Sequence, residues 1–271
     1  MPKLLVTATA AALIASAAVA GTLSRTDLAS ASSGFAQVAD HNIAYTVRGG
    51  GRPVIVLITG LGDDMNVFEG VAAKLARAAT VITYDRPGYG KSPRIDHPAG
   101  AKAAAEDLAG VLQQSGIPGP YVIVGHSLGG LIAEQFAALH PDKVSGLVLE
   151  DSRPAAFGPQ CEAAGIKACT PTPQMVRWAS AGTQSDVAGL DSTTADVAAI
   201  RPASNLRILV ISRDLAKSPT PFETAWSLAQ TELAHRYPGA VQLIAPTTRH
   251  DVHRAAPDWF CASIVTFAEG T

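Results

Sequence analysis

Residues 122–130 read VIVGHSLGG, and this stretch decides how the chain is expected to fold. Its first three residues are typical of a buried strand, and the Leu- and Ala-rich residues that follow it are typical of a helix. A strand that enters a helix through one tight turn strains the turn residue, and bulky neighbours would clash there. Gly125 and Gly129 remove those clashes on either side of Ser127. The pattern therefore predicts a serine hydroxyl exposed at the carboxyl edge of a sheet.

Similar short runs rich in Val and Ile recur along the chain and alternate with helical patterns. A hairpin is expected first, followed by runs that are apolar on both faces, as in the middle of a parallel sheet. The expected strands are 35–40, 42–49, 54–59, 81–84, 121–125, 144–150, 207–212 and 241–245, and the expected helices are 66–78, 100–115, 128–139, 221–236 and 257–268. This order predicts an α/β fold with a mostly parallel eight-stranded sheet, an antiparallel start and helices on both faces.

Residues 153–205 interrupt this alternation. They contain Pro, Gly, Ser, Thr and two cysteines but no strong strand pattern, so we expect a small cap inserted after the sixth strand. No internal repeat or second core is evident. With 47% hydrophobic and 16% charged residues among 271, the chain is expected to form one globular domain over 21–271.

Residues 1–20, MPKLLVTATAAALIASAAVA, have the layout of a secretory signal peptide with cleavage after Ala20. Thr7, Thr9 and Ser16 dilute the apolar run, so stable membrane insertion is not expected. Removal of the segment takes away Lys3 and leaves 20 Lys+Arg against 23 Asp+Glu, a net charge of −3. This acidic balance argues against nucleic acid as a partner. We expect a secreted or periplasmic protein.

Three cysteines in an exported chain suggest one disulfide and one spare thiol. The eight-residue spacing favours Cys161 with Cys169 and leaves Cys261 free, although three buried thiols remain an alternative. No CxxC or paired Cys/His spacing typical of a metal site is present.

Four stretches in order make the sequence resemble the α/β-hydrolase superfamily over nearly all of the mature chain. They are ITGLGDD (58–64), YDRPGYGKS (84–92), GHSLGG (125–130) and TRHDVH (248–253). The resemblance implies a serine esterase-like enzyme in which the third stretch carries the nucleophile, Ser127, and the last carries the base.

The same resemblance implies an oxyanion hole built from two backbone N–H groups, those of Leu61 and Leu128. Many relatives have a histidine before the glycine of the first stretch, where this chain has Thr59. Because the donor is a backbone group, we expect Thr59 to alter loop packing more than chemistry. Asp85 and Arg86, in the second stretch, are interpreted as anchors of a turn.

His250 follows the last predicted strand and is favoured as the base over His253. A metal site formed by these two histidines and Asp251 lacks a third convincing ligand. His126, directly before the serine, is interpreted as a packing residue.

The acid must lie at a strand end beside the base. Asp214, after the seventh strand, is favoured, and Asp151, at the end of the sixth, is the alternative. Glu150 is a weaker choice, because its side chain should point to the opposite face from that of Asp151.

These residues predict acyl transfer through an acyl-enzyme on Ser127 without a cofactor, with a small-molecule ester as the substrate. Three alternatives remain: a non-catalytic ligand-binding relative, and a perhydrolase or an aminopeptidase that uses the same triad. The oligomeric state is left open.

Overall fold

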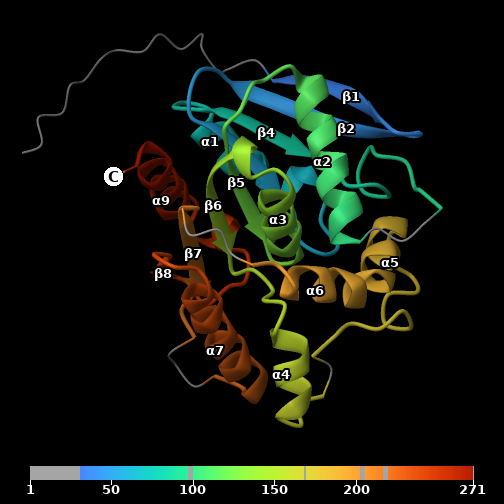
Figure 1. Cartoon of the computed structure of the whole chain (residues 1–271), viewed down its shortest axis with the longest axis vertical. Helices are drawn as coiled ribbons and strands as arrows, with labels where there is room; N and C mark the ends of the chain where they lie inside the picture. Colours follow the sequence, from blue (N-terminus) through green and yellow to red (C-terminus); the bar gives the residue numbers. More distant parts are fainter. Residues whose placement is uncertain (1–30, 97–99, 168, 202–204, 216–218, 271) are drawn as a thin grey trace, which may run out of the picture.

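Eight strands form one sheet in the order β1-β2-β4-β3-β5-β6-β7-β8 (Figure 1). The computed structural model describes residues 31–96, 100–167, 169–201, 205–215 and 219–270, so the predicted signal peptide lies outside the described residues. β2 runs antiparallel to both of its neighbours and the other pairs are parallel. The predicted sheet with its antiparallel start is confirmed. The strands are β1 (Ser32–Val38), β2 (His41–Gly49), β3 (Val54–Ile58), β4 (Thr80–Tyr84), β5 (Tyr121–His126), β6 (Val144–Glu150), β7 (Ile208–Arg213) and β8 (Val241–Ala245).

Helices cover both faces of the sheet because the central strands are apolar on both sides. In β3, Val54, Val56 and Ile58 pack with α2 (Ala101–Ser115), α3 (Leu128–Leu139) and α7 (Pro221–Arg236). Ile55 and Leu57 point the other way and pack with α1 (Glu69–Leu75) and α9 (Pro257–Glu269). This alternation follows from the two-residue period of a strand. Short helical turns complete these layers: η1 (Met65–Phe68), η2 (Pro141–Lys143) and α8 (Val252–Ala255).

The predicted insertion after β6 contains three short helices, α4 (Phe157–Ala163), α5 (Ala181–Ala188) and α6 (Leu190–Ala198). They lie together at one end of the sheet (Figure 1). The favoured disulfide is confirmed: Cys161 and Cys169 are bonded, and Cys261 is free and buried. Among the described residues, no helix is both long and apolar enough to span a membrane.

The helix that follows Ser127, α3, buries a carboxyl group among its apolar residues. Glu134 is 2% exposed; the hydroxyl of Tyr237 donates a hydrogen bond to its Oε2, and Arg236 Nη1 lies 4.0 Å from the same oxygen. Burial raises the pKa of Glu134 to about 7, although Tyr237 and Arg236 both oppose the shift. The folded protein therefore prefers the protonated form of this residue.

We expect Glu134→Gln to remove part of the pH dependence of stability. Between pH 4.5 and about 7 the unfolded wild type releases a proton that the folded form still holds. Stability from this group is therefore fully present below pH 4.5 and is lost as the pH rises. The advantage of the variant in free energy of unfolding should grow by roughly 3 kcal/mol across this range. Urea denaturation at several pH values measures it, with the exposed Glu269→Gln as control. Parallel pH profiles for Glu134→Gln and wild type would contradict the assignment.

Candidate active site

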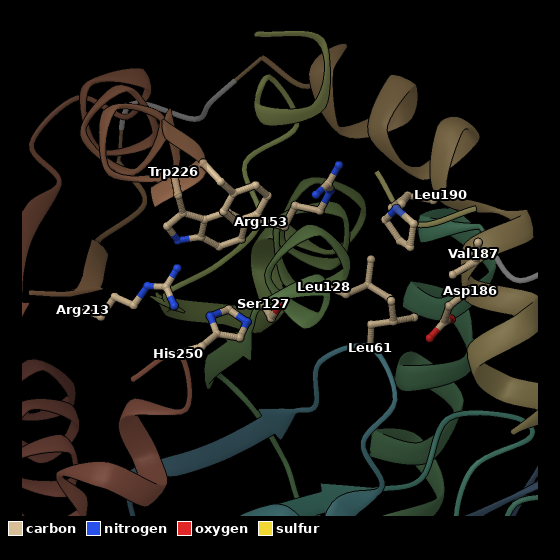
Figure 2. A pocket seen from close by; sticks show the side chains of 12 residues that line it. Leu61, Ser127, Leu128, Arg153, Asp186, Val187, Leu190, Arg213, Trp226 and His250 are labelled. Atoms are coloured by element: carbon tan, nitrogen blue, oxygen red, sulfur yellow. The ribbon is translucent and has the colours of Figure 1, made fainter. Parts of the chain in front are cut away.

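A cavity of about 270 Å³ lies between the carboxyl edge of the sheet, the insertion and α7 (Figure 2). Most of its wall is apolar, with a small number of polar and charged groups, which is typical of sites for small organic molecules. Its lining residues are Leu61, Ser127, Leu128, Arg153, Pro171, Asp186, Val187, Leu190, Arg213, Phe222, Trp226 and His250.

Ser127 occupies the tight turn between β5 and α3 that the sequence predicted. Its backbone has φ 51° and ψ −117°, a strained conformation for a residue with a side chain. A Cβ at Gly125 would lie 2.5 Å from the carbonyl oxygen of Gly129, and one at Gly129 would lie 2.4 Å from that of Ile58. Both glycines are therefore required by close approach of the backbone, and the strained turn presents Ser127 to the cavity.

The end of β6 fastens this turn. The Ser127 N–H donates to the carbonyl of Glu150 at 3.1 Å, and the Arg153 N–H donates to the carbonyl of Ser127 at 3.0 Å. The Ser152 hydroxyl donates to the carbonyl of Gly125 at 2.9 Å. Because both backbone polar groups of Ser127 are satisfied, the turn can keep its strained geometry.

His250 meets the carboxylate that follows β6 rather than the one that follows β7. Its Nδ1 lies 2.6 Å from Oδ2 of Asp151, which is fully buried. With the Nδ1 proton donated to the carboxylate, Nε2 is left as the acceptor. Ser127 and His250 line the same cavity, and Figure 2 shows both at its floor. Their side chains make no direct hydrogen bond within the described residues; such bonds are often long in enzymes without substrate.

Two further groups hold Asp151 in place. The Trp226 indole N–H donates to Oδ1 at 3.0 Å, and Arg213 Nε lies 3.3 Å from Oδ2. The indole ring also stands edge-on to the His250 ring, 5.5 Å between centroids. Sequence reasoning missed Trp226 and Arg213, since no local motif marks a residue 75 positions from its partner.

Asp214, the acid favoured from the sequence, lies elsewhere. Its N–H donates to the carbonyl of Thr247 at 2.7 Å, which joins the loop after β7 to the loop that precedes His250. Asp214 does not line the cavity. The Nδ1 position of His250 is already taken by Asp151, so the geometry favours the alternative, Asp151, over Asp214 as the partner of the ring.

His253 is buried behind the site instead of facing it. Both its N–H and its ring Nδ1 contact Oε1 of Glu150, at 2.7 and 2.8 Å. His126 packs 5.0 Å from the His253 ring and 4.7 Å from that of His250, and burial lowers the pKa of His126 to about 4. These contacts anchor the histidine loop, which is the segment from His250 to His253, to the ends of β5 and β6.

The three buried residues of this anchor are also potential metal ligands. In the described part of the chain, His126, Glu150 and His253 are the one group of three potential ligands whose ligand atoms lie within 4.8 Å of one another. Since Oε1 of Glu150 already accepts two hydrogen bonds from His253, the arrangement favours a hydrogen-bonded anchor over a set of metal ligands.

Two backbone amides at the cavity are available as donors. Leu128 N–H is the first of α3, and such groups have no partner within their own helix. Neither it nor the Leu61 N–H donates to another described residue. Arg86 holds the loop that carries Leu61 by donating to the carbonyls of Thr59 and Gly60 at 2.6 and 2.9 Å.

Arg86 also connects this loop to the insertion. Its guanidinium forms a buried ion pair with Asp186 at 2.8 Å, and the Tyr89 hydroxyl donates to the same carboxylate oxygen at 2.7 Å. Burial opposes the charge, but Asp186 raises the pKa of Arg86 above its usual value. The sequence predicted only that Arg86 anchors a turn. In the structure it also connects the Leu61 loop to the insertion.

Comparisons with known proteins agree with this architecture. A family model described as the alpha/beta hydrolase fold matches residues 53–203, more than half of the chain. An uncharacterized protein of Mycobacterium tuberculosis is 42% identical over 118 residues, which cover 42% of this chain and 33% of that protein. The pimeloyl-acyl-carrier-protein methyl ester esterase of Chromobacterium violaceum is 42% identical over 105 residues, 39% of each chain.

These matches therefore span less than half the length of the curated relatives. A solved structure of a thermophilic esterase from Thermogutta terrifontis, with malate bound, has a TM-score of 0.70 at 22% identity. The comparison covers 88% of this chain and 98% of that one, and it shows a shared fold.

Asp186→Asn is expected to destabilise the protein by about 3 kcal/mol, because it leaves the buried Arg86 guanidinium without its counter-charge. Urea denaturation measures the loss. The matched control is Asp196→Asn, which breaks the more exposed ion pair with Lys102 and should change stability by less than about 1 kcal/mol. Equal effects of the two substitutions would show that the buried pair has no special structural role.

Proposed function

The chain belongs to the α/β-hydrolase family, and we propose that it is an exported serine hydrolase that cleaves carboxylic esters. In this proposal Ser127 is the nucleophile, His250 the general base and Asp151, in place of Asp214, the acid. The 2.6 Å contact of Asp151 with His250, which lines the same cavity as Ser127, carries the proposal. It supplies the tautomer and the charge stabilisation that a serine nucleophile needs from its base.

The reaction would proceed in two halves. The Ser127 oxygen attacks the ester carbonyl while His250 Nε2 takes its proton and returns it to the leaving alcohol, which forms an acyl-enzyme. Water, activated by the same imidazole, then releases the acid and regenerates the serine. The Leu61 and Leu128 amides would donate to the negative oxygen of each tetrahedral intermediate, each contributing about 3 kcal/mol. No cofactor takes part in this cycle.

The charges around the cavity favour an ester over an N-terminal amine substrate. An aminopeptidase needs a free carboxylate for the substrate ammonium. Asp186 is the acidic residue of the insertion that lines the cavity, and Arg86 already neutralises it. A perhydrolase would use the same three side chains, and dependence of turnover on hydrogen peroxide distinguishes it from an esterase.

Export is part of the proposal because of residues 1–20, and the disulfide between Cys161 and Cys169 supports it. Disulfides persist in oxidising compartments and are rare in the cytosol. The first residue of the exported protein tests the predicted cleavage after Ala20.

A non-catalytic ligand-binding relative is the rival from another class. We expect a fluorophosphonate probe to label the wild-type protein at one site and to leave Ser127→Ala unlabelled, because only an activated serine reacts with it. Intact mass measurement gives the stoichiometry. Folded wild-type protein that stays unlabelled would favour the binder.

Asp151→Asn is expected to lower kcat for a short nitrophenyl ester by about 10²–10⁴-fold, since the amide cannot stabilise the imidazolium or hold the required tautomer. Asp214→Asn should lower kcat by less than tenfold, because it leaves the contact between His250 and Asp151 in place. Steady-state kinetics on both variants, with Ser127→Ala as the blank, measures the two effects. The opposite order would return the acid role to Asp214.

A further inference from the structure

Three charged side chains besides the candidate triad line the cavity, and two of them are compensated. Asp186 pairs with Arg86 at 2.8 Å, and Arg213 lies 3.3 Å from Asp151. Arg153 has no carboxylate within 4.0 Å in the described part of the chain. The cavity wall therefore carries one positive charge without a direct ion pair, that of Arg153 (Figure 2).

Neutral groups hold the Arg153 side chain in the cavity wall. Nη1 donates to the carbonyl of Cys169 at 3.1 Å and Nη2 to the hydroxyl of Thr170 at 3.2 Å. The guanidinium carbon lies 5.2 Å from the centre of the Phe157 ring. The backbone N–H of Arg153 is bonded to Ser127, and its guanidinium is bonded to Cys169, which belongs to the disulfide. Both ends of Arg153 are therefore held in place, which fixes the position of the guanidinium relative to Ser127.

This arrangement leaves the cation poorly solvated. Burial lowers the pKa of Arg153, and the more distant Glu162 opposes the shift only partly. A buried charge without a counter-ion is unfavourable, and a carboxylate that binds it in a fork geometry would relieve the cost. The other lining residues are mainly apolar, including Leu128, Val187 and Phe222, and suit a short hydrocarbon chain.

We propose that the cavity selects esters that carry a free carboxylate, such as half-esters of dicarboxylic acids, and that Arg153 binds this carboxylate. The inference rests on the proposed esterase function for its chemistry, but the binding site itself does not require turnover. Arg153 acts here as a specificity-determining residue and takes no part in the acyl transfer.

The kinetic test uses two matched pairs of substrates, each differing by a carboxylate in place of a methyl group. Monomethyl glutarate against methyl pentanoate puts the carboxylate on the acyl side, and 4-acetoxybutanoate against butyl acetate puts it on the alcohol side. We expect the wild type to prefer the carboxylated member of at least one pair in kcat/KM. Arg153→Gln should lower that preference at least tenfold, while Arg153→Lys keeps part of it.

The control is Arg177→Gln, which removes a positive charge from an exposed position of the insertion outside the cavity. It should leave the preference unchanged. Because the readout is a ratio of two substrates, a general loss of activity from disturbed packing cancels. A wild-type ratio near one in both pairs, or an unchanged ratio in Arg153→Gln, would overturn the proposal.

A binding arm separates this inference from the proposed function. Titration calorimetry with glutarate on Ser127→Ala should show binding that weakens at least tenfold when Arg153→Gln is added and by a smaller factor when Arg153→Lys is added. Glutarate binding without turnover of any ester would overturn the esterase and keep the carboxylate site. Turnover of neutral esters without glutarate binding would do the reverse.

Discussion

The attachment of the Ser127 turn to the end of β6 is the constraint on which the rest of the site depends. A residue with φ 51° needs its backbone groups satisfied from outside, and the Glu150 carbonyl and the Arg153 amide do this. The Ser152 hydroxyl reaches the carbonyl of Gly125 from the same segment. The segment at the end of β6 therefore both supports the Ser127 turn and supplies Asp151 and Arg153, the proposed acid and the proposed carboxylate-binding residue. Their positions relative to the serine are set by one stretch of backbone instead of by separate loops.

The alternation of side chains at the end of β6 gives this strand two roles on opposite sides. Asp151 turns toward the cavity and meets His250, whereas Glu150 points behind it and meets His253. The histidine loop is thus held at two points three residues apart. The buried contact fixes the position of the loop, and the other sets the orientation of the imidazole in the cavity.

The charged residues around this cavity differ in whether an opposite charge lies beside them. Arg86 and Asp186 join the loop of Leu61 to the insertion, and their charges cancel away from water. Asp151 is similarly balanced by its neighbours. Arg153 stands apart, since its partners are a carbonyl, a hydroxyl and an aromatic ring. A partly buried charge is less costly when a counter-charge lies beside it, and the absence of a direct ion pair at Arg153 is the basis of the proposed carboxylate site.

Local pattern by itself determined the strand and helix order, the turn at Ser127 and the histidine that follows the last strand. These features depend on periodicity and on glycine spacing within about ten residues, which the sequence displays directly. Only the tertiary structure shows which of Asp151 and Asp214 contacts His250. Both follow strands that end at the same edge of the sheet, and the path of the histidine loop determines which carboxylate the ring meets. The roles of Trp226 and of the cavity charges were decided in the same way, because they arise from contacts between segments far apart in the chain, whose proximity no local pattern records.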